Sequence, residues 1–144
     1  MGDDYLHTLP DQVFLLEGTL DLLETLHKKI PMIMVTNGIG VVQHKRLDNI
    51  GLKPFFDHIV VSEECGFTKP DKRIFHHTFN LLNVAHHAPN VLMVGDKLET
   101  DILGAQNVGV DSCWLNTNKV VNTTSIVPTY EIQNIIDLLK ILFN

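Results

Sequence analysis

Apolar and polar segments alternate regularly along this chain of 144 residues. Short apolar runs end in a turn or a polar residue at 30–38, 55–64, 90–96 and 112–116. Runs of this kind are typical of strands that a parallel sheet buries on both faces. Between them, apolar residues recur every three or four positions, which predicts helices. The predicted helices span 10–29, 41–51, 69–84, 99–110 and 130–143.

Individual residues indicate where these helices begin, end and face the core. Gly51 is expected to cap the end of the second helix, and Pro70 with Asp71 to start the third. The apolar stripe expected on the first helix is Leu16, Leu20, Leu23 and Leu26. The stripe expected on the last helix is Ile132, Ile135, Ile136, Leu139 and Leu142.

Alternating strands and helices predict an α/β fold with a parallel sheet and right-handed crossovers. The chain is long enough for one core and too short for two ordinary domains, so we expect a single domain over residues 1–144. Ligands of such sheets bind where the carboxyl ends of the strands converge. The residues that follow each strand are therefore the candidates for function.

The composition narrows the classes of function. A content of 44% hydrophobic and 19% charged residues is that of a globular protein. The net charge of −6 argues against a nucleic-acid partner. No apolar run is long enough to cross a bilayer and no secretion signal is present, so a cytoplasmic protein without a membrane partner is expected. Cys65 and Cys113 lack metal-binding spacing and are expected to be reduced.

Five polar residues follow the predicted strands. Thr36 and Asn37 follow the first strand, Lys69 follows the second, and Asp96 and Asp101 follow the third. Carboxylate oxygens suit Mg²⁺. A lysine can balance the charge on phosphoryl oxygens, and a threonine at a strand end can hold them. The set as a whole suits a phosphate group held against a magnesium ion.

Each of these residues also has an ordinary structural explanation. Thr36 and Asn37 alone are a common strand-to-turn ending, and Lys69 before a proline is more often solvated. Asp96 and Asp101 alone could belong to a turn and a helix cap. Only their shared position after successive strands favours a common site.

Three segments that carry these residues resemble motifs of the haloacid dehalogenase (HAD) superfamily of phosphohydrolases. "MIMVTNG" resembles its second motif, "GFTKPDKRIF" its third and "VLMVGDKLETDILGA" its fourth. The resemblance implies a Rossmann-like, three-layer α/β/α core. It also implies phosphate binding by Thr36, Asn37 and Lys69, catalytic roles for Lys69 and Asp101, and Asp96 as the Mg²⁺ ligand.

Within the superfamily, the sequence is similar to the cytosolic 5′-nucleotidase branch and to the related N-acylneuraminate 9-phosphatases. The similarity covers the "VSEE.G..KPD..IF" and "GD.L.TDI.GA" patterns. It implies a small phosphorylated substrate, with a nucleoside 5′-monophosphate as the expected one. Mg²⁺ is the expected cofactor.

The stretch "FLLEGTL" looks at first like the first motif of the family, which carries the nucleophilic aspartate. However, Leu15 stands at the nucleophile position and Glu17 at that of the acid/base aspartate. The 18 positions from Gly18 to Thr36 are filled by one helix and one strand. The stretch better resembles the segment where the family's chain returns from its helical cap. Asp4, in "DYLHT", has no apolar strand before it and is not expected to be a nucleophile.

The first motif and the cap are therefore expected to be absent from these 144 residues. The corresponding strand would be the central one, between the strands that end at Thr36 and Asp96. The two strands must then close up, or residues 1–14, a separate N-terminal piece or a second copy must fill the place, because unpaired buried backbone groups cost about 1–3 kcal/mol each.

Two functions follow from this interpretation. In the first, the complete form is a phosphatase that works through an aspartyl-phosphate, and this chain alone is inactive and binds Mg²⁺ weakly. In the second, the chain is a non-catalytic binding or assembly module that pairs through an exposed sheet edge, as a homodimer for example. A response-regulator-like domain shares the alternation but does not explain the "VGD…TDI.GA" pattern.

Overall fold

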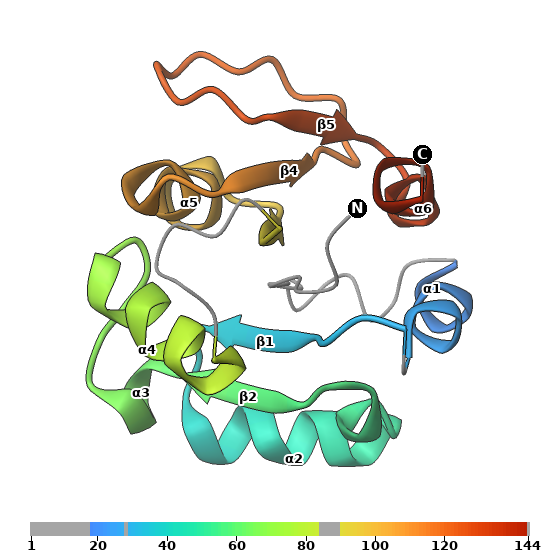
Figure 1. The fold of residues 1–144 in the computed structure, drawn as a ribbon, viewed down its shortest axis with the longest axis vertical. Coiled ribbons are helices and arrows are strands. Elements are labelled where there is room, and N and C mark those ends of the chain that lie inside the picture. Colours follow the sequence, from blue (N-terminus) through green and yellow to red (C-terminus); the bar gives the residue numbers. More distant parts are fainter. Residues whose placement is uncertain (1–17, 28, 84–89, 144) are drawn as a thin grey trace.

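The computed structural model describes residues 18–27, 29–83 and 90–143, and in these ranges helices and strands alternate (Figure 1). The strands are β1 (Ile33–Thr36), β2 (His58–Val61), β3 (Leu92–Gly95), β4 (Asp111–Leu115) and β5 (Tyr130–Ile132). The α-helices are α1 (Thr19–Leu26), α2 (Gly40–Ile50), α3 (Ser62–Cys65), α4 (Lys72–Leu82), α5 (Leu103–Val108) and α6 (Leu138–Leu142). Shorter turns are η2 (Lys53–Phe55), the π-helical η3 (Leu98–Ile102) and η4 (Ile135–Asp137). No helix in the described ranges has the length and apolarity needed to span a membrane.

The strands form two parallel sheets. β1 pairs with β2, while β3, β4 and β5 form the second sheet in that order. Among the described residues, no strand pairing joins β1 to β3. The α/β class with parallel strands is confirmed, and the division falls between the strands that end at Thr36 and Gly95, where the sequence predicted a missing central strand.

Both faces of β1 and β3 are buried. Met32 and Met34 pack in one apolar cluster with α1 and α6, whereas Ile33 and Val35 pack in another with α4 and α5. Successive side chains of a strand point to opposite faces, so a continuous apolar run serves both clusters. Helices therefore cover both faces of the strands, in three layers.

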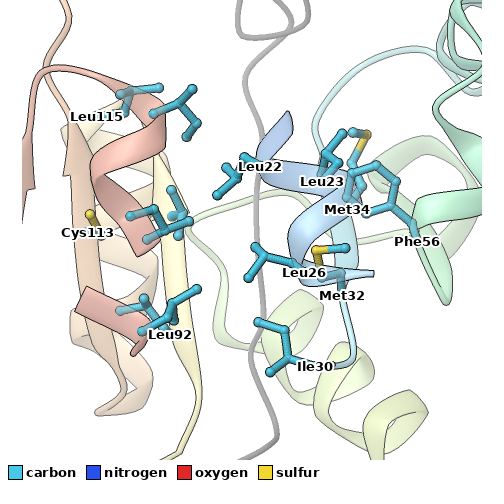
Figure 2. Close-up of a cluster of buried hydrophobic side chains, with 14 of the residues drawn as sticks. Leu22, Leu23, Leu26, Ile30, Met32, Met34, Phe56, Leu92, Cys113 and Leu115 are labelled. Carbon is cyan, nitrogen blue, oxygen red and sulfur yellow. The ribbon is translucent and has the colours of Figure 1, made fainter. Parts of the chain in front are cut away.

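Both clusters contain side chains of the two sheets, and α1 lies in the first of them. Figure 2 shows Leu22, Leu23 and Leu26 of α1 lying between side chains that come from the two sheets. On one side are Met32, Met34 and Phe56, and on the other are Leu92, Cys113 and Leu115. The three α1 leucines are at most 1% exposed. Apolar packing through α1 on one face, and through α4 and α5 on the other, thus holds the two sheets together.

The predicted ends of two helices are confirmed. Gly51 follows α2 with a φ of 70°, a left-handed conformation that glycine adopts without steric cost. The Asp71 carboxylate accepts a hydrogen bond of 2.8 Å from the Arg73 N–H at the start of α4. Helix α4 turns Phe75 and Phe79 fully into the core.

The predicted stripe of the first helix was partly wrong. Leu20 is 53% exposed, and Leu22, which was not predicted, is 1% exposed. Helix α1 begins only at Thr19, after Gly18. Leu22, Leu23 and Leu26 then share the face that meets the core, and Leu20 points to solvent. Leu16 lies outside the described residues.

The predicted helix over 130–143 was also partly wrong. Its first residues form β5, which pairs with β4 in the register Cys113↔Tyr130, and only Leu138–Leu142 is α-helical. The open edge of β4 offers backbone hydrogen bonds that a local pattern does not reveal. Ile132, Ile135 and Leu142 are buried as expected, but Ile136 is 38% exposed.

The packing of Gly104 against Phe75 leads to a stability prediction. A Cβ at Gly104 would overlap the ring carbons Cε2 and Cζ of Phe75. Gly104→Ala should therefore lower the free energy of unfolding by about 1–3 kcal/mol, measured by urea denaturation, because the core is overpacked. In a Phe75→Leu background the same change should be neutral or stabilising, since alanine favours helix. Equal losses in both backgrounds would contradict this packing.

Candidate active site

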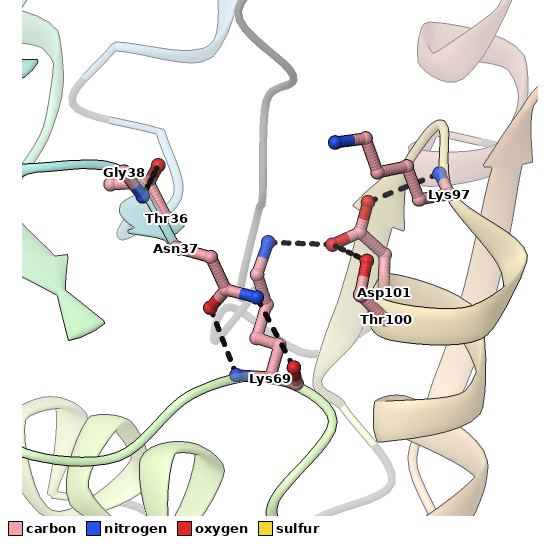
Figure 3. Close-up of polar contacts among 7 residues, drawn as sticks. All are labelled: Thr36, Asn37, Gly38, Lys69, Lys97, Thr100 and Asp101. Atoms are coloured by element: carbon pink, nitrogen blue, oxygen red, sulfur yellow. Dashed lines mark hydrogen bonds and ion pairs between the residues drawn. The ribbon is translucent and has the colours of Figure 1, made fainter.

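The five predicted residues lie at the carboxyl edge of the strands. Thr36 ends β1 and Asn37 follows it, while Asp96 follows β3 and Asp101 lies in the adjoining turn η3. Lys69 lies between α3 and α4 and reaches across to Asp101 (Figure 3). The contacts of Lys69 with Asn37 and with Asp101 bring these residues to one side of the molecule, as predicted.

Lys69 and Asp101 form a buried ion pair. The Lys69 Nζ atom lies 2.6 Å from the Asp101 Oδ1 atom, and the side chains are only 7% and 2% exposed. The second oxygen of Asp101 accepts a 3.2 Å hydrogen bond from the Lys97 backbone N–H. Both carboxylate oxygens of Asp101 are thus engaged, and the Lys69 ammonium is held at a defined place.

The Asn37 side chain positions Lys69. Its Nδ2 atom donates to the Lys69 carbonyl at 3.1 Å, and its Oδ1 atom accepts from the Lys69 N–H at 2.9 Å. This two-bond contact fixes the backbone of Lys69 to the end of β1 (Figure 3). Sequence reasoning placed Asn37 with the phosphate-binding residues and did not find this contact.

Thr36 presents a hydroxyl at the same edge. Its side chain is 9% exposed, and Oγ1 accepts a 3.1 Å hydrogen bond from the Gly38 N–H. Accepting that bond leaves the hydroxyl hydrogen to donate to another group. An anion at this edge is one group that could accept it.

Asp96 is the incompletely paired carboxylate of the site. Its Oδ1 atom is buried and has no hydrogen-bond partner among the described residues. Burial raises the pKa of Asp96 above its ordinary value, and the nearby charge of Asp101 raises this pKa further, whereas Lys97 and Lys69 act in the opposite direction. The Trp114 indole N–H donates to the Asp96 carbonyl at 3.1 Å, which fixes the backbone there.

Gly95 is required by close packing before Asp96. A Cβ at this position would overlap the carboxylate of Asp101. The "GD" of the fourth motif thus has a steric explanation, because only glycine lets β3 pass Asp101 so closely.

The described residues fit a magnesium ion that is bound by one protein carboxylate, with water and substrate oxygens as its other ligands. Within the described ranges, no group of three or more metal-binding side chains occurs. Mg²⁺ commonly uses one or two carboxylates together with water and phosphate oxygens. The unpartnered Oδ1 of Asp96 meets that need, whereas Asp101 is already bound to Lys69.

Some sequence predictions fall outside this description. Asp4, Leu15 and Glu17 lie outside the described residues, so their assignments stay predictions. Lys97 is exposed, as an unpaired surface lysine would be. The contacts of Asn37 and Trp114 were missed, because a side chain that bonds a distant backbone group leaves no local pattern.

Comparisons with known proteins agree with the motifs. A family model for haloacid dehalogenase-like hydrolases matches residues 3–109. The HAD-hydrolase YfnB of Bacillus subtilis is 41% identical over 128 residues, which are 89% of this chain and 54% of that protein. The pyrimidine 5′-nucleotidase YjjG of Escherichia coli is 32% identical over 142 residues, 99% of this chain and 63% of that protein.

A third relative acts on a different substrate. The N-acylneuraminate-9-phosphatase of Homo sapiens is 34% identical over 126 residues, which are 86% of this chain and 50% of that protein. The chain thus spans between half and two thirds of the length of these relatives.

Solved structures show the same fold. The crystal structure of YfnB bound to magnesium has a TM-score of 0.83 and 39% identity, over 90% of this chain and 56% of that one. The core domain of a protein from Streptococcus pneumoniae has a TM-score of 0.76 and 20% identity, over 98% of this chain and 96% of that one. At 20% identity the second likeness concerns the fold alone.

Removing only one member of the buried ion pair should strongly destabilise the fold. Asp101→Asn or Lys69→Met should each lower the free energy of unfolding by about 3–5 kcal/mol, because the remaining charge stays buried without a partner. The double variant should lose clearly less than the sum of the two. Urea denaturation measures all three.

The control for that cycle is the exposed pair Lys53–Asp48, at 3.4 Å. Asp48→Asn should change the free energy of unfolding by at most about 1 kcal/mol. If the losses of unfolding free energy at Asp101 and Lys69 are additive and no larger than the loss at Asp48, the two residues do not form a buried ion pair.

The raised pKa of Asp96 predicts that ionisation of this carboxyl lowers the stability of the fold as pH rises. A carboxyl whose folded pKa lies above its ordinary value of 3.8 stabilises the fold below that value, and this contribution is lost as pH rises through the folded pKa. In metal-free buffer, Asp96→Asn should therefore be more stable than the original chain at pH 7, and the gain should shrink toward pH 4. Urea denaturation at the two pH values measures the difference. A gain that is constant with pH would exclude titration of Asp96 as its cause.

Proposed function

Because the chain belongs to the haloacid dehalogenase-like hydrolase family, we propose that it provides the phosphoryl- and metal-binding edge of a phosphoric monoester hydrolase. The observation that carries the proposal is the buried Lys69–Asp101 pair beside the unpartnered carboxylate of Asp96. This combination places a fixed positive charge next to a carboxylate that has a free oxygen.

The side chains take separate roles in this proposal. The Lys69 ammonium balances negative charge on the phosphoryl oxygens, and the Thr36 hydroxyl donates to one of them. Asn37 holds Lys69 in place through its backbone. Asp101 is a positioning residue, since both of its oxygens are engaged by Lys69 and Lys97.

Asp96 would hold magnesium through its free oxygen. The ion, when bound, would polarise the phosphoryl group and offset its charge. Burial of Asp96 favours this role, since a half-buried carboxylate with no other partner gains from a cation.

The proposed substrate is a nucleoside 5′-monophosphate. Two similar proteins, from Escherichia coli and Streptococcus pneumoniae, are pyrimidine 5′-nucleotidases, at 32% and 35% identity over 99% of this chain. The three human, mouse and rat relatives are N-acylneuraminate-9-phosphatases, so a sugar-acid phosphate is the competing class.

We further propose that residues 1–144 form one partial core domain that does not turn over substrate alone. The sequence has no Asp-x-Asp pair after an apolar strand, and Asp101 is committed to Lys69. Without a nucleophile, the remaining groups bind and polarise the phosphate but form no covalent intermediate.

A second candidate function is assembly through a sheet edge. In the part of the chain that the structure describes, β1 pairs with β2 alone and β3 with β4 alone. Strands that pair on one side favour addition of another strand, from a second copy or a separate N-terminal piece. The two functions are compatible, since a supplied strand could also bring the missing nucleophile.

Phosphate binding by the 144-residue chain tests the proposal. Inorganic phosphate with Mg²⁺ should shift the backbone amide signals of Asn37 and Gly38 in ¹H–¹⁵N spectra. Thr36→Val should weaken phosphate binding about tenfold or more, because a hydrogen bond to a charged group contributes about 1.5–3 kcal/mol. Thr25→Val, in helix α1 and outside the site, is the matched control and should leave the affinity unchanged.

The same preparations should hydrolyse neither p-nitrophenyl phosphate nor uridine 5′-monophosphate above the blank, with or without Asp96→Ala. Turnover lost in Asp96→Ala would mean that the chain holds a nucleophile, with Asp4 the first to examine. Absence of phosphate binding would overturn the proposed site. Sedimentation of the chain at the assay concentration distinguishes a monomer from the assembly function.

A further inference from the structure

A pocket of about 570 Å³ adjoins Asp96 and the end of β4. One wall is the segment 96–99 after β3, and the other is formed by residues from 114 to 124, at the end of β4 and beyond. The volume is in the range of small-molecule sites, about 300–1,000 Å³. The five proposed site residues were predicted from sequence, but this pocket was not.

The loop over the pocket has a defined conformation. The buried side chain of Asn116 donates to the Val120 carbonyl at 2.8 Å and accepts from the Val120 N–H at 2.9 Å. It also donates to Glu131 of β5 at 2.9 Å. Asn122 donates to the Ile126 carbonyl at 2.7 Å. Two asparagine side chains thus hold the loop in place, and the pocket does not depend on a ligand to shape it.

The pocket combines apolar walls with a few polar groups. Its apolar lining is Leu98, Trp114, Leu115, Val120 and Val121. Val120 and Val121 are 59% and 79% exposed, which is unfavourable for aliphatic side chains unless something covers them.

Three polar side chains at the pocket are free to bind. Thr117, Asn118 and Thr123 line it, and their side chains have no hydrogen-bond partner among the described residues. This is the pattern of a site for a ring that has an apolar face and a polar edge. Lys97 and Glu99 line the pocket as well, and it is the apolar surface of Trp114 and the two valines that favours a flat base over a sugar.

The pocket and the phosphoryl site share one residue. Asp96 lines the pocket, and its carbonyl accepts the hydrogen bond from Trp114, which lines the pocket too. A ligand whose phosphoryl group is held by Lys69 and Thr36, beside a metal ion on Asp96, could therefore extend between the loop and Leu98.

We infer that this pocket receives the nucleoside part of the substrate, with the base against Trp114, Val120 and Val121. The inference rests on the proposed function and adds to it that residues 116–124 select the substrate. Selection then resides partly in the core domain itself.

Titration of the 144-residue chain with uridine 5′-monophosphate in the presence of Mg²⁺ tests the inference. Trp114 is the single tryptophan, so its indole N–H gives one signal that reports on the pocket. The nucleotide should shift this signal and the amides of 117–124, and should bind about tenfold or more tighter than inorganic phosphate, a factor that corresponds to about 1.4 kcal/mol. Inorganic phosphate should shift Asn37 and Gly38 but not 117–124.

Two variants with the same added charge sharpen the test. Val121→Glu should reduce the ratio of nucleotide to phosphate affinity about tenfold, a factor equal to about 1.4 kcal/mol. Val127→Glu, at a 74% exposed valine outside the pocket, is the matched control and should leave the ratio unchanged.

The outcomes separate the two proposals. If phosphate shifts Asn37 and Gly38 but the nucleotide leaves Trp114 and 117–124 unmoved, the pocket assignment is wrong and the proposed function stands. If glucose 6-phosphate shifts 117–124 as strongly as the nucleotide, the inferred substrate class is wrong. If the nucleotide shifts Trp114 and phosphate binds nowhere, the pocket stands and the phosphoryl site does not.

Discussion

The buried ion pair between Lys69 and Asp101 is the polar contact on which the site depends. Lys69 belongs to the half of the molecule that contains β1 and β2, and Asp101 to the half that contains β3, β4 and β5. Among the described residues, no strand pairing joins these halves, so they are held by the apolar clusters on both faces of the strands and, at the carboxyl edge, by this pair. The geometry of the candidate site therefore depends on how the two sheets are positioned relative to each other.

Other polar contacts attach the two members of the ion pair to their own halves of the molecule. Asn37 fixes the backbone of Lys69 to the end of β1, and the Lys97 N–H fixes Asp101 to the segment after β3. Gly95 lets that segment pass without displacing the carboxylate. A charge held from two sides in this way loses little further freedom when a phosphate group binds, which is the advantage of a preorganised site.

Asp96 differs from Asp101 in how its charge is balanced. Asp101 is almost fully buried but has Lys69 as a partner, whereas Asp96 is half-buried with one oxygen that has no partner among the described residues. The raised pKa of Asp96 expresses the cost of that arrangement. Residues that are strained or poorly paired in the free protein are often those that bind a ligand, since the ligand supplies what is missing.

Sequence by itself determined the first four strands, the main helices between them, the α/β class and the five residues at the strand ends. It could do so because buried strands need continuous apolar runs, and because parallel strands bring their carboxyl ends to one edge. The "GD" of the fourth motif includes Gly95, but the sequence alone did not show that close packing against Asp101 requires a glycine there.

Only the tertiary structure decided which residues contact one another. Residues 130–132 became β5 because β4 offered an open edge, and Leu22 rather than Leu20 lies in the core because that face of α1 packs against the first apolar cluster. The Asn37 contact, the indole bond of Trp114 and the pocket under 116–124 join residues far apart in the chain. Such contacts depend on where whole elements pack, and no local pattern of residue types encodes them.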